Sequence, residues 1–361
     1  MKVYKDLYGQ ITSTENLFEA WNFFKRDKRN RPDVEVFEKN VEYEIFKLAR
    51  ELRIKHYRHG AYQMFLIHDP KLRRIHKAAV RDRVLHHAIF KVLNPIFEPA
   101  FIPTSFSCRV DKGTHKGVEY LARTLRAASK NGKNSCFSLK CDVWKFFDSI
   151  DHDILIGILE KRIIDPDTRW LMREIVESYE AAGSTRERER ERERESKNTT
   201  RKGVPIGNLT SQFFANIYLN EFDQFMKHEL RVKYYARYTD DFVIVSEDQS
   251  YLQSLIPKIN EFLHARLALS LHSNKVFIRK YRQGIDFLGY VALIYHVATR
   301  TKTRRRISRK LHDQVRKFKA GTTSEETLLA SLNSYLGFFS HADAYEAAEE
   351  LKGQFWFWMG E

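Results

Sequence analysis

The sequence predicts an α+β protein, with helices toward both ends of the chain and short strands between them. Apolar residues recur at helical spacing through residues 1–60, and the last sixty residues show a similar pattern. Two short apolar runs at 234–238 and 242–245 flank a tight turn, which is the pattern of an antiparallel hairpin. A third run at 136–142 alternates between two faces. The length of 361 residues allows two or three lobes at roughly 150 residues per domain.

The composition excludes several classes of protein. Hydrophobic residues make up 43% of the chain, which is enough for a core and excludes a wholly disordered protein. No run of 18 uncharged apolar residues occurs, so we expect no membrane span, and the first residues lack the apolar segment of a secretory signal. Cys108, Cys136 and Cys141 form no C-x-x-C pair, which argues against a disulfide framework or a zinc ribbon. These features favour a reducing compartment, and we expect a cytoplasmic protein.

The net charge is strongly positive. Lys and Arg number 62 against 47 Asp and Glu, which gives a formal net charge of +15. Such a charge indicates an anionic partner, and nucleic acid is the usual one for a basic enzyme, because each neutralised phosphate releases counterions. The alternative is that the charge serves solubility alone.

The other elements are predicted from periodicity and from helix-breaking residues. The segment from Asp82 to Phe97 has a helical pattern, with Asp82 as its N-cap and Asn94-Pro95 ending or kinking it. The strand at 136–142 ends near Asp142. Beyond these we expect helices at 152–181 and 251–267, short strands at 275–278 and 285–290, and a helical C-terminal part that begins with a run of Lys and Arg.

One segment has low complexity. Residues 186–195 read RERERERERE, and in a helix their i,i+4 pairs would be like-charged while their i,i+3 pairs would be opposite. The two contributions largely cancel, so we expect a solvated, flexible insertion over residues 184–200 with no chemical role. A contact with RNA or with a partner is the functional alternative.

The carboxylates of YTDD, residues 238–241, are the central chemical feature of the chain. Two adjacent carboxylates repel each other, so a fold keeps them where they meet cations, either Lys and Arg or Mg²⁺. Asp142 would complete a cluster of three if its strand lay beside the turn. Such a cluster could hold two Mg²⁺ ions about 4 Å apart, as nucleotidyl transfer or nuclease chemistry requires. The alternatives are an ordinary polar hairpin turn for YTDD and a helix N-cap for Asp142.

Seven blocks, in order over about residues 60–295, resemble those of bacterial retroelement reverse transcriptases. The third, LKCDVWKFFDSIDHDIL (139–155), and the fifth, YTDDFVIV (238–245), contain the three aspartates. The others are residues 71–84, SFSCRVDKGTH (105–115), GVPIGNLTSQFFANIYLNEFD (203–223), LHSNKVFI (271–278) and GIDFLGY (284–290). The ordered series is far more specific than any single motif.

The resemblance implies a right-hand polymerase fold and RNA-directed DNA polymerase activity. It divides the chain into a helical N-terminal extension (1–60), fingers (61–135), a palm with an antiparallel sheet (136–295) and a helical thumb (296–361). IGNLTSQ, residues 206–212, and SYLGFFSHADAY, residues 334–345, resemble the enzymes of diversity-generating retroelements. That type implies error-prone DNA synthesis from a template-repeat RNA. The alternative is a reverse transcriptase of phage defence, or of another bacterial retroelement, that copies a non-coding RNA.

The resemblance also implies roles for the residues of the catalytic centre. Asp142, Asp240 and Asp241 would bind two Mg²⁺ ions, with Mn²⁺ as a substitute. The carbonyl of Val143 would complete the coordination. Lys275 would protonate the leaving pyrophosphate as a general acid, or else contact phosphate only.

The remaining assignments concern the nucleotide and the nucleic acid. The deoxynucleoside triphosphate (dNTP) would be bound by Lys71, Arg73, Arg74, Phe147 and Gln212. Phe147 would exclude a ribose 2′-hydroxyl, and Gln212 would lie near the nascent base pair. A solvated basic loop is the alternative for the three cations, and a core position is the alternative for Phe147. The template RNA, the primer and their RNA–DNA hybrid would contact Tyr238, Gly289, Arg304, Arg305 and Arg306.

A small basic accessory protein is the further partner that the resemblance implies.

Two other classes of function compete with a polymerase. A catalytically silent RNA-binding subunit is disfavoured because Asp142, Asp240 and Asp241 are all present. A two-metal nuclease is disfavoured by the ordered series of seven blocks.

Overall fold

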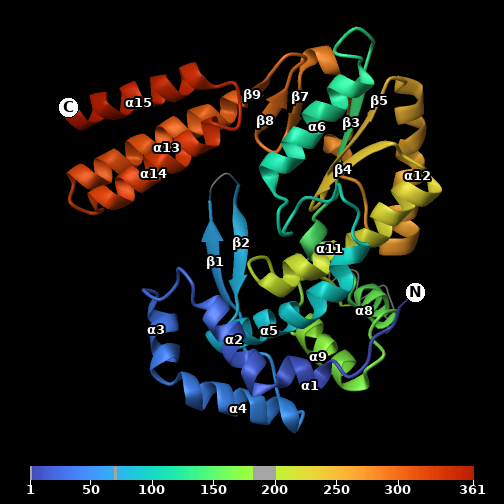
Figure 1. Cartoon of the computed structure of the whole chain (residues 1–361), viewed down its shortest axis with the longest axis vertical. Helices are drawn as coiled ribbons and strands as arrows, with labels where there is room; N and C mark the ends of the chain where they lie inside the picture. The colour runs from blue at the N-terminus through green and yellow to red at the C-terminus, as the bar shows by residue number, and fades with distance from the viewer. Residues whose placement is uncertain (1, 69–70, 182–200) are drawn as a thin grey trace, which may run out of the picture. The chain divides into compact units, whose positions relative to one another are not determined.

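The computed structural model describes residues 2–68, 71–181 and 201–361, and it confirms an α+β fold with antiparallel sheets (Figure 1). The chain forms two compact units, each built from three segments. The first unit comprises Met1–Pro103, Val143–Arg231 and Lys258–Ser273, and the second comprises Thr104–Asp142, Val232–Pro257 and Asn274–Glu361. The predicted Arg/Glu insertion at 184–200 lies outside the described residues.

Helices dominate the first unit. Its N-terminal helices bury an apolar core that includes Leu17, Trp21 and Leu48 against Leu85 and Ile89 of the long helix α5. One two-stranded antiparallel hairpin, β1–β2, projects from it. The elements are α1 (Tyr8–Thr12), α2 (Thr14–Phe24), α3 (Pro32–Lys39), α4 (Val41–Arg53), β1 (Gln63–Ile67), β2 (Arg73–Lys77), α5 (Val80–Phe97), η1 (Glu98–Ala100), α7 (Phe146–Ser149), α8 (His152–Glu160), α9 (Pro166–Glu177), α11 (Leu209–Gln224) and a π-helical turn (Phe225–Glu229).

Helix α5 begins earlier than predicted and ends at Phe97, as predicted. It begins at Val80, after Ala79, so Asp82 is not its N-cap. Asp82 is instead 1% exposed and accepts hydrogen bonds from the Tyr57 hydroxyl at 2.8 Å and the Gly60 amide at 3.1 Å. Pro95 lies inside the last turn, and the helix continues to Phe97. Leu93, Ile96 and Phe97 are buried there, and their packing outweighs the hydrogen bond that proline removes.

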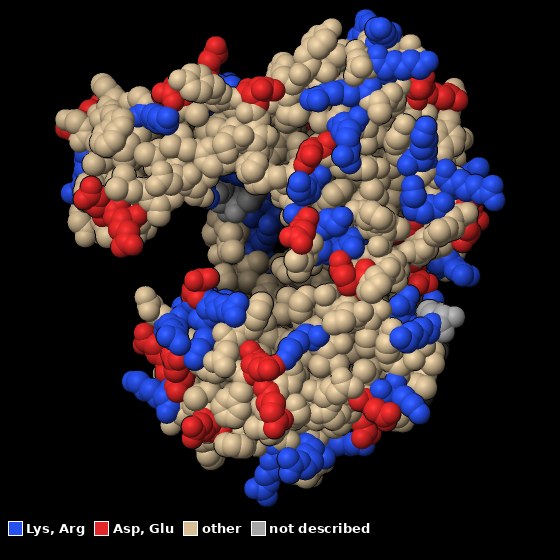
Figure 2. Space-filling view, viewed as in Figure 1, with Lys and Arg blue, Asp and Glu red and all other residues tan. Residues whose placement is uncertain are grey.

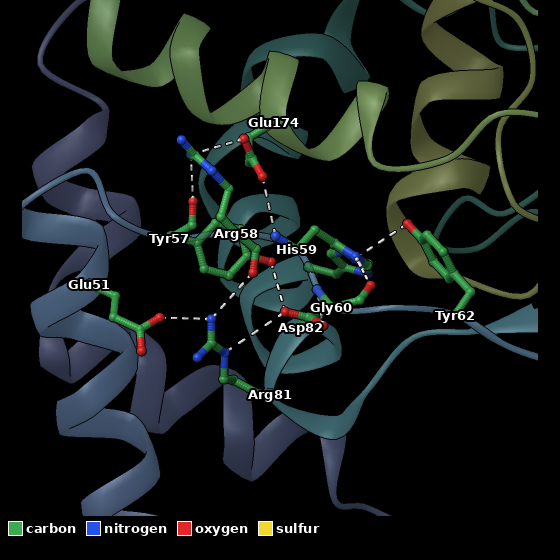
Figure 3. Close-up of polar contacts among 10 residues, drawn as sticks. Glu51, Tyr57, Arg58, His59, Gly60, Tyr62, Arg81, Asp82 and Glu174 are labelled. Carbon is green, nitrogen blue, oxygen red and sulfur yellow. Dashed lines mark hydrogen bonds and ion pairs between the residues drawn. The ribbon is translucent and has the colours of Figure 1, made fainter.

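The contacts around Asp82 anchor the chain that leads into β1 (Figure 3). Arg81 pairs with Glu51 of α4 at 2.8 Å. On the other side, Glu174 of α9 accepts from Arg58 and from the backbone amide of His59, both at 3.3 Å. The segment before the hairpin is therefore fixed to three helices.

The second unit contains a four-stranded antiparallel sheet in the order β4-β5-β3-β6. The predicted strands are confirmed as β3 (Phe137–Asp142), β4 (Tyr234–Tyr238) and β5 (Asp241–Ser246). The predicted strand at 275–278 is shifted, because Ser273–Lys275 form a 3₁₀ turn (η3) and β6 covers Phe277–Lys280. Helix α6 (Thr114–Ala128) packs on the sheet, and α12 (Gln249–Leu267) follows β5.

A second, three-stranded sheet and a helical bundle complete this unit. The predicted strand at 285–290 is two strands, β7 (Ile285–Phe287) and β8 (Tyr290–Ala292), because Leu288 and Gly289 form a turn with φ of 52° and 93°. A strand that the sequence did not predict, β9 (Val297–Thr299), pairs with β8. The predicted C-terminal helices are α13 (Thr301–Lys319), α14 (Glu325–Phe339) and α15 (Tyr345–Gly360), which enclose their own apolar core.

Figure 2 shows basic side chains spread over much of the visible face and interspersed with acidic ones. The positive net charge is thus not gathered into one patch on that face. Within the described ranges, no helix is long and apolar enough to cross a membrane. None of the three cysteines is in a disulfide.

Candidate active site

The three predicted aspartates meet at one end of the four-stranded sheet. Asp142 is the last residue of β3 and Asp241 is the first residue of β5, and the two are partners in the antiparallel register. Tyr238 and Asp241 are likewise partners across β4 and β5. The turn between these strands is therefore Thr239-Asp240, one residue shorter than predicted, and Asp240 is next to the Asp142–Asp241 pair.

Asp241 lies in a desolvated position. The pKa of its carboxyl is raised to about 6, chiefly by burial; Lys140 opposes the shift, and the nearby charges of Asp142 and Asp240 add to it. The Lys140 ammonium lies 3.2 Å from Asp241 Oδ2. Asp241 Oδ1 is buried and has no hydrogen-bond partner among the described residues. One oxygen thus faces a lysine, and the other is left for a ligand that the protein does not supply.

Lysines compensate two of the three carboxylates. Lys275 Nζ lies 2.8 Å from Asp142 Oδ1, so the 3₁₀ turn brings this predicted residue into the site. Lys140 Nζ also donates to the carbonyl oxygen of Asp286 at 3.2 Å. Lys140 was not among the predicted site residues, although its position carried a signal: strand alternation places residues 140 and 142 on the same face of β3.

The chemistry of these groups fits a divalent cation. Mg²⁺ prefers carboxylate oxygens, and a buried carboxylate oxygen without a hydrogen-bond donor is a suitable ligand. In the parts of the chain that are described, no three His, Cys, Asp or Glu side chains already converge as a set of metal ligands. Asp142 and Asp241 are each paired with a lysine. Val143, the predicted fourth ligand, is buried and forms an isolated bridge with Leu271 in the first unit.

The residues predicted to bind the dNTP all belong to the first unit. Arg73 and Arg74 begin β2, and Lys71 precedes it. All three side chains are exposed, and none has an ion-pair partner within the described part of the chain. Exposed cations without an ion-pair partner are expected at a binding site for an anionic ligand, and they are equally expected in a solvated basic loop.

The hairpin is tied to the start of α11. The His76 amide donates to the Ile206 carbonyl at 3.0 Å, and the Asn208 amide group donates to the His76 carbonyl at 2.7 Å. Gly207, with φ of +114°, permits this approach, because a Cβ there would lie 2.7 Å from Ile75 Cγ2. The structure therefore joins the strand of Arg73 and Arg74 to the helix that carries Gln212.

Two of the predicted dNTP-binding residues, Gln212 and Phe147, are more exposed to solvent than the buried residues next to them in sequence. Gln212 is exposed, whereas Thr210, Ser211 and the residues from 213 to 219 are buried. Phe146 is 2% exposed and belongs to the core, whereas Phe147 is only partly buried. Their rings form an edge contact with centroids 5.4 Å apart. Phe147 is therefore the member of the pair that is available to a ligand.

The residues predicted to contact the primer and template lie in the second unit. Tyr238 ends β4, and its hydroxyl accepts from Thr114 Oγ1 at 3.4 Å. The carbonyl of Gly289 accepts from the Arg300 amide at 3.1 Å, at the start of α13. Arg304 pairs with Glu350 at 3.6 Å, while Arg305 and Arg306 have no acidic partner among the residues described.

Three buried residues that support the turn were not predicted from the sequence. Ser107 contacts Thr239, and Arg237 contacts Ser105, each across 132 residues of sequence, while Arg237 also contacts Thr239 two residues away. No local pattern could have indicated the two long-range contacts.

An antiparallel sheet that carries an acidic turn beside a strand-end aspartate suits an enzyme that acts on phosphodiesters. Comparison with known families makes the class definite. The sequence profile of the family described as reverse transcriptase (RNA-dependent DNA polymerase) matches residues 68–292, which is more than half of the chain. The chain belongs to the reverse transcriptase family, and its matched domain has the right-hand polymerase fold.

Individual relatives support the same assignment at low identity. Protein YkfC of Escherichia coli is 24% identical over 254 residues, which cover 61% of this chain and 63% of that protein. The group II intron-encoded protein LtrA of Lactococcus lactis is 23% identical over 282 residues and is covered to 44%. A putative COX1/OXI3 intron 2 protein of Saccharomyces cerevisiae is 21% identical over 341 residues and is covered to 37%. The chain thus spans between about a third and two thirds of the length of these relatives.

Proposed function

We propose that this chain is an RNA-directed DNA polymerase whose catalytic carboxylates are Asp142, Asp240 and Asp241. The observation that supports it most is the register of β3 and β5, which pairs Asp142 with Asp241 in a chain of the reverse transcriptase family. In this proposal the N-terminal helices up to residue 60 form an extension, residues 61–135 the fingers, 136–295 the palm and 296–361 the thumb.

In the proposed reaction, the 3′-hydroxyl oxygen of a primer bonds to the α-phosphorus of a dNTP and its proton passes to solvent. The bond from that phosphorus to the bridging oxygen breaks, and pyrophosphate leaves. Asp142, Asp240, Asp241 and the Val143 carbonyl would hold two Mg²⁺ ions, or Mn²⁺ in their place, which supply stabilisation of the charge that develops on phosphate. Lys275, beside Asp142, donates a proton to the leaving group or binds its phosphate.

The remaining roles in the proposal belong to other parts of the chain. Lys71, Arg73 and Arg74 bind the triphosphate, since Arg and Lys pair with phosphate oxygens. Phe147 selects the deoxyribose, and Gln212 lies near the nascent base pair. Tyr238, Gly289 and the α13 cations Arg304, Arg305 and Arg306 contact the primer, the template RNA and the hybrid that they form.

The finer biological role that we propose is error-prone copying of a template-repeat RNA in a diversity-generating retroelement. The IGNLTSQ segment, residues 206–212, supports it, with Gln212 exposed at the first turn of α11. A small basic accessory protein and a cytoplasmic location belong to the same proposal. Phage defence, or another retroelement that copies a non-coding RNA, is the alternative that the test below distinguishes.

The test is primer extension on an RNA template with dNTPs and Mg²⁺, followed by sequencing of the product. We expect DNA synthesis by the wild type and none by the Asp240→Ala/Asp241→Ala double variant. Errors concentrated opposite template adenines would support diversity generation, and a faithful or repetitive product would support the alternative role. Synthesis that survives in the double variant would contradict the proposal.

A further inference from the structure

The turn between β4 and β5 contains a residue in a strained conformation. Thr239 has φ of +55°, in the left-handed region. A β-branched residue is a genuine outlier there, because its Cβ crowds the following carbonyl oxygen. Such a conformation persists only where surrounding groups fix it. The residue that follows Thr239 is Asp240, so the turn also sets the direction of two catalytic carboxylates.

Two buried side chains hold Thr239. The Ser107 and Thr239 hydroxyl oxygens form a hydrogen bond of 2.7 Å. Arg237 Nη1 donates to the carbonyl oxygen of Thr239 at 3.1 Å. Ser107 is 3% exposed and Arg237 is 1% exposed, so each contact has one partner that is shielded from water. One contact fixes the side chain of the turn residue and the other fixes its backbone.

The supporting residues are themselves anchored. Arg237 Nη2 donates to Ser105 Oγ at 3.1 Å, and Ser105 is fully buried. The backbone of Arg237 donates to the Thr104 carbonyl at 3.0 Å and accepts from the Phe106 amide at 2.9 Å. The segment of residues 104–107 thus runs alongside β4 and fixes both the backbone and the guanidinium group of Arg237. We call Ser105, Ser107 and Arg237 the turn brace.

We propose that Ser107 and Arg237 are positioning residues, which hold Thr239 in its left-handed conformation and thereby orient Asp240 and Asp241 for nucleotide addition. They act through Thr239 and need not touch substrate. This inference rests on the proposed polymerase function. The family resemblance assigned no role to Ser107 or Arg237.

The test is a double-mutant cycle between Ser107→Ala and Thr239→Val, which removes the same hydrogen bond from either side. Each variant should lower kcat for single-nucleotide addition about tenfold, the effect of one lost buried hydrogen bond, with KM for the dNTP unchanged. The double variant should be no slower than either single variant. Ser138→Ala is the matched control, because Ser138 is equally buried in the same sheet and its hydroxyl has no hydrogen-bond partner in the described part of the chain.

Arg237 is tested by rescue. Arg237→Met should lower kcat by at least about tenfold, and Arg237→Lys should recover part of the loss, since lysine retains a charged donor. Were Arg237→Met to fail to fold, the cycle between residues 107 and 239 would still decide the proposal. Additive losses in that cycle, or a kcat within twofold of the wild type in both single variants, would overturn it.

Hydrogen exchange separates this proposal from the proposed function. The amides of residues 238–241 should exchange about tenfold faster in Ser107→Ala than in the wild type or in Ser138→Ala, because the turn opens more often. Faster exchange in a protein that polymerises on no template would support the brace and refute the polymerase. Unchanged exchange would refute the brace, whether or not the protein is active.

Discussion

At the scale of single residues, the proposed catalytic end of the sheet brings charged side chains into a partly buried position. Asp241 faces Lys140 with one oxygen and lacks a donor for the other among the described residues. The ionised form is therefore disfavoured in the folded protein, as the raised pKa of about 6 indicates. Sites that bind charged ligands often retain such unfavourable groups at a cost in stability.

The first prediction concerns the pH dependence of stability. The pKa of Asp241 is raised from 3.8 to about 6 on folding, so between these values the folded state holds more protons than the unfolded state. The free energy of unfolding should therefore fall as pH rises from about 4 to about 6. Asp241→Asn lacks this titrating group and does not lose stability in this way. The free energy of unfolding of the variant, taken relative to the wild type, should therefore be higher at pH 7 than at pH 4 by on the order of 2 kcal/mol.

The measurement is urea unfolding in EDTA at several pH values. Glu247→Gln is the control, because Glu247 follows the other end of β5 and is exposed. Parallel pH profiles for the wild type and Asp241→Asn would contradict the desolvation of Asp241.

The second prediction separates two neighbouring phenylalanines. Phe146→Ala should destabilise the protein by about 3–5 kcal/mol, because the ring is buried in the core. Phe147→Ala should destabilise the protein less than Phe146→Ala does. It should also raise the ratio of ribonucleotide to deoxyribonucleotide incorporation at least about tenfold, which corresponds to the loss of a steric barrier of roughly 1.4 kcal/mol. The ratio comes from kcat/KM for both nucleotides on one template. An unchanged ratio in a folded Phe147→Ala protein would show that this ring does not contact the sugar.

At the scale of elements, local patterns predicted the strands and the hairpin, and tertiary contacts decided the rest. β4 and β5 are short apolar runs beside a turn, so their pairing follows from sequence. Of the two effects predicted for Asn94-Pro95, an end or a kink, the helix end does not occur there, because the buried residues Ile96 and Phe97 continue α5 to its predicted last residue. Asp82, a suitable N-cap by residue type, became a buried acceptor for Tyr57 and Gly60 instead.

The third prediction concerns the attachment of the β1–β2 hairpin. Gly207→Ala forces a Cβ to within 2.7 Å of Ile75 Cγ2 at φ of +114°, so it should destabilise the protein by about 1–3 kcal/mol and raise KM for the dNTP. Gly157→Ala is the control, because a Cβ at this site in α8 meets nothing within 4 Å. It should stabilise by about 0.5–1 kcal/mol. Thermal unfolding and steady-state kinetics check both, and equal effects at the two glycines would contradict the close contact.

At the scale of the whole chain, the ordered blocks predicted the family and its sheet, but not the groups that support the site. Ser107 and Thr239 are 132 residues apart, as are Ser105 and Arg237, and nothing local links them. Each compact unit is likewise assembled from three separate segments, which no boundary drawn along the sequence can express. Lys140 is the exception, since its spacing from Asp142 already placed both on one face of a strand.

The fourth prediction uses the net charge of +15. A plot of log Kd for an RNA–DNA hybrid against the logarithm of the salt concentration should be a rising straight line. Arg305→Ala and Arg306→Ala should each reduce its slope by about 1, which is the effect of losing one phosphate contact. Arg173→Ala is the control, because Arg173 is paired with Glu160 at 2.7 Å in the first unit. Fluorescence anisotropy from low to high salt measures the slopes. A slope equal to that of the wild type in both α13 variants would remove this helix from the nucleic-acid site.

The most direct measurement is the rate at which one dNTP is added to a primer on an RNA template, compared between Asp142→Asn and Glu247→Gln. Asp142 is the register partner of Asp241, whereas Glu247 lies beyond the far end of β5. We predict a loss of at least about a thousandfold for Asp142→Asn, as for removal of a principal group that stabilises the transition state, and a rate within about twofold of wild type for Glu247→Gln. Comparable rates for the two variants would contradict the assignment of this end of the sheet as the catalytic centre.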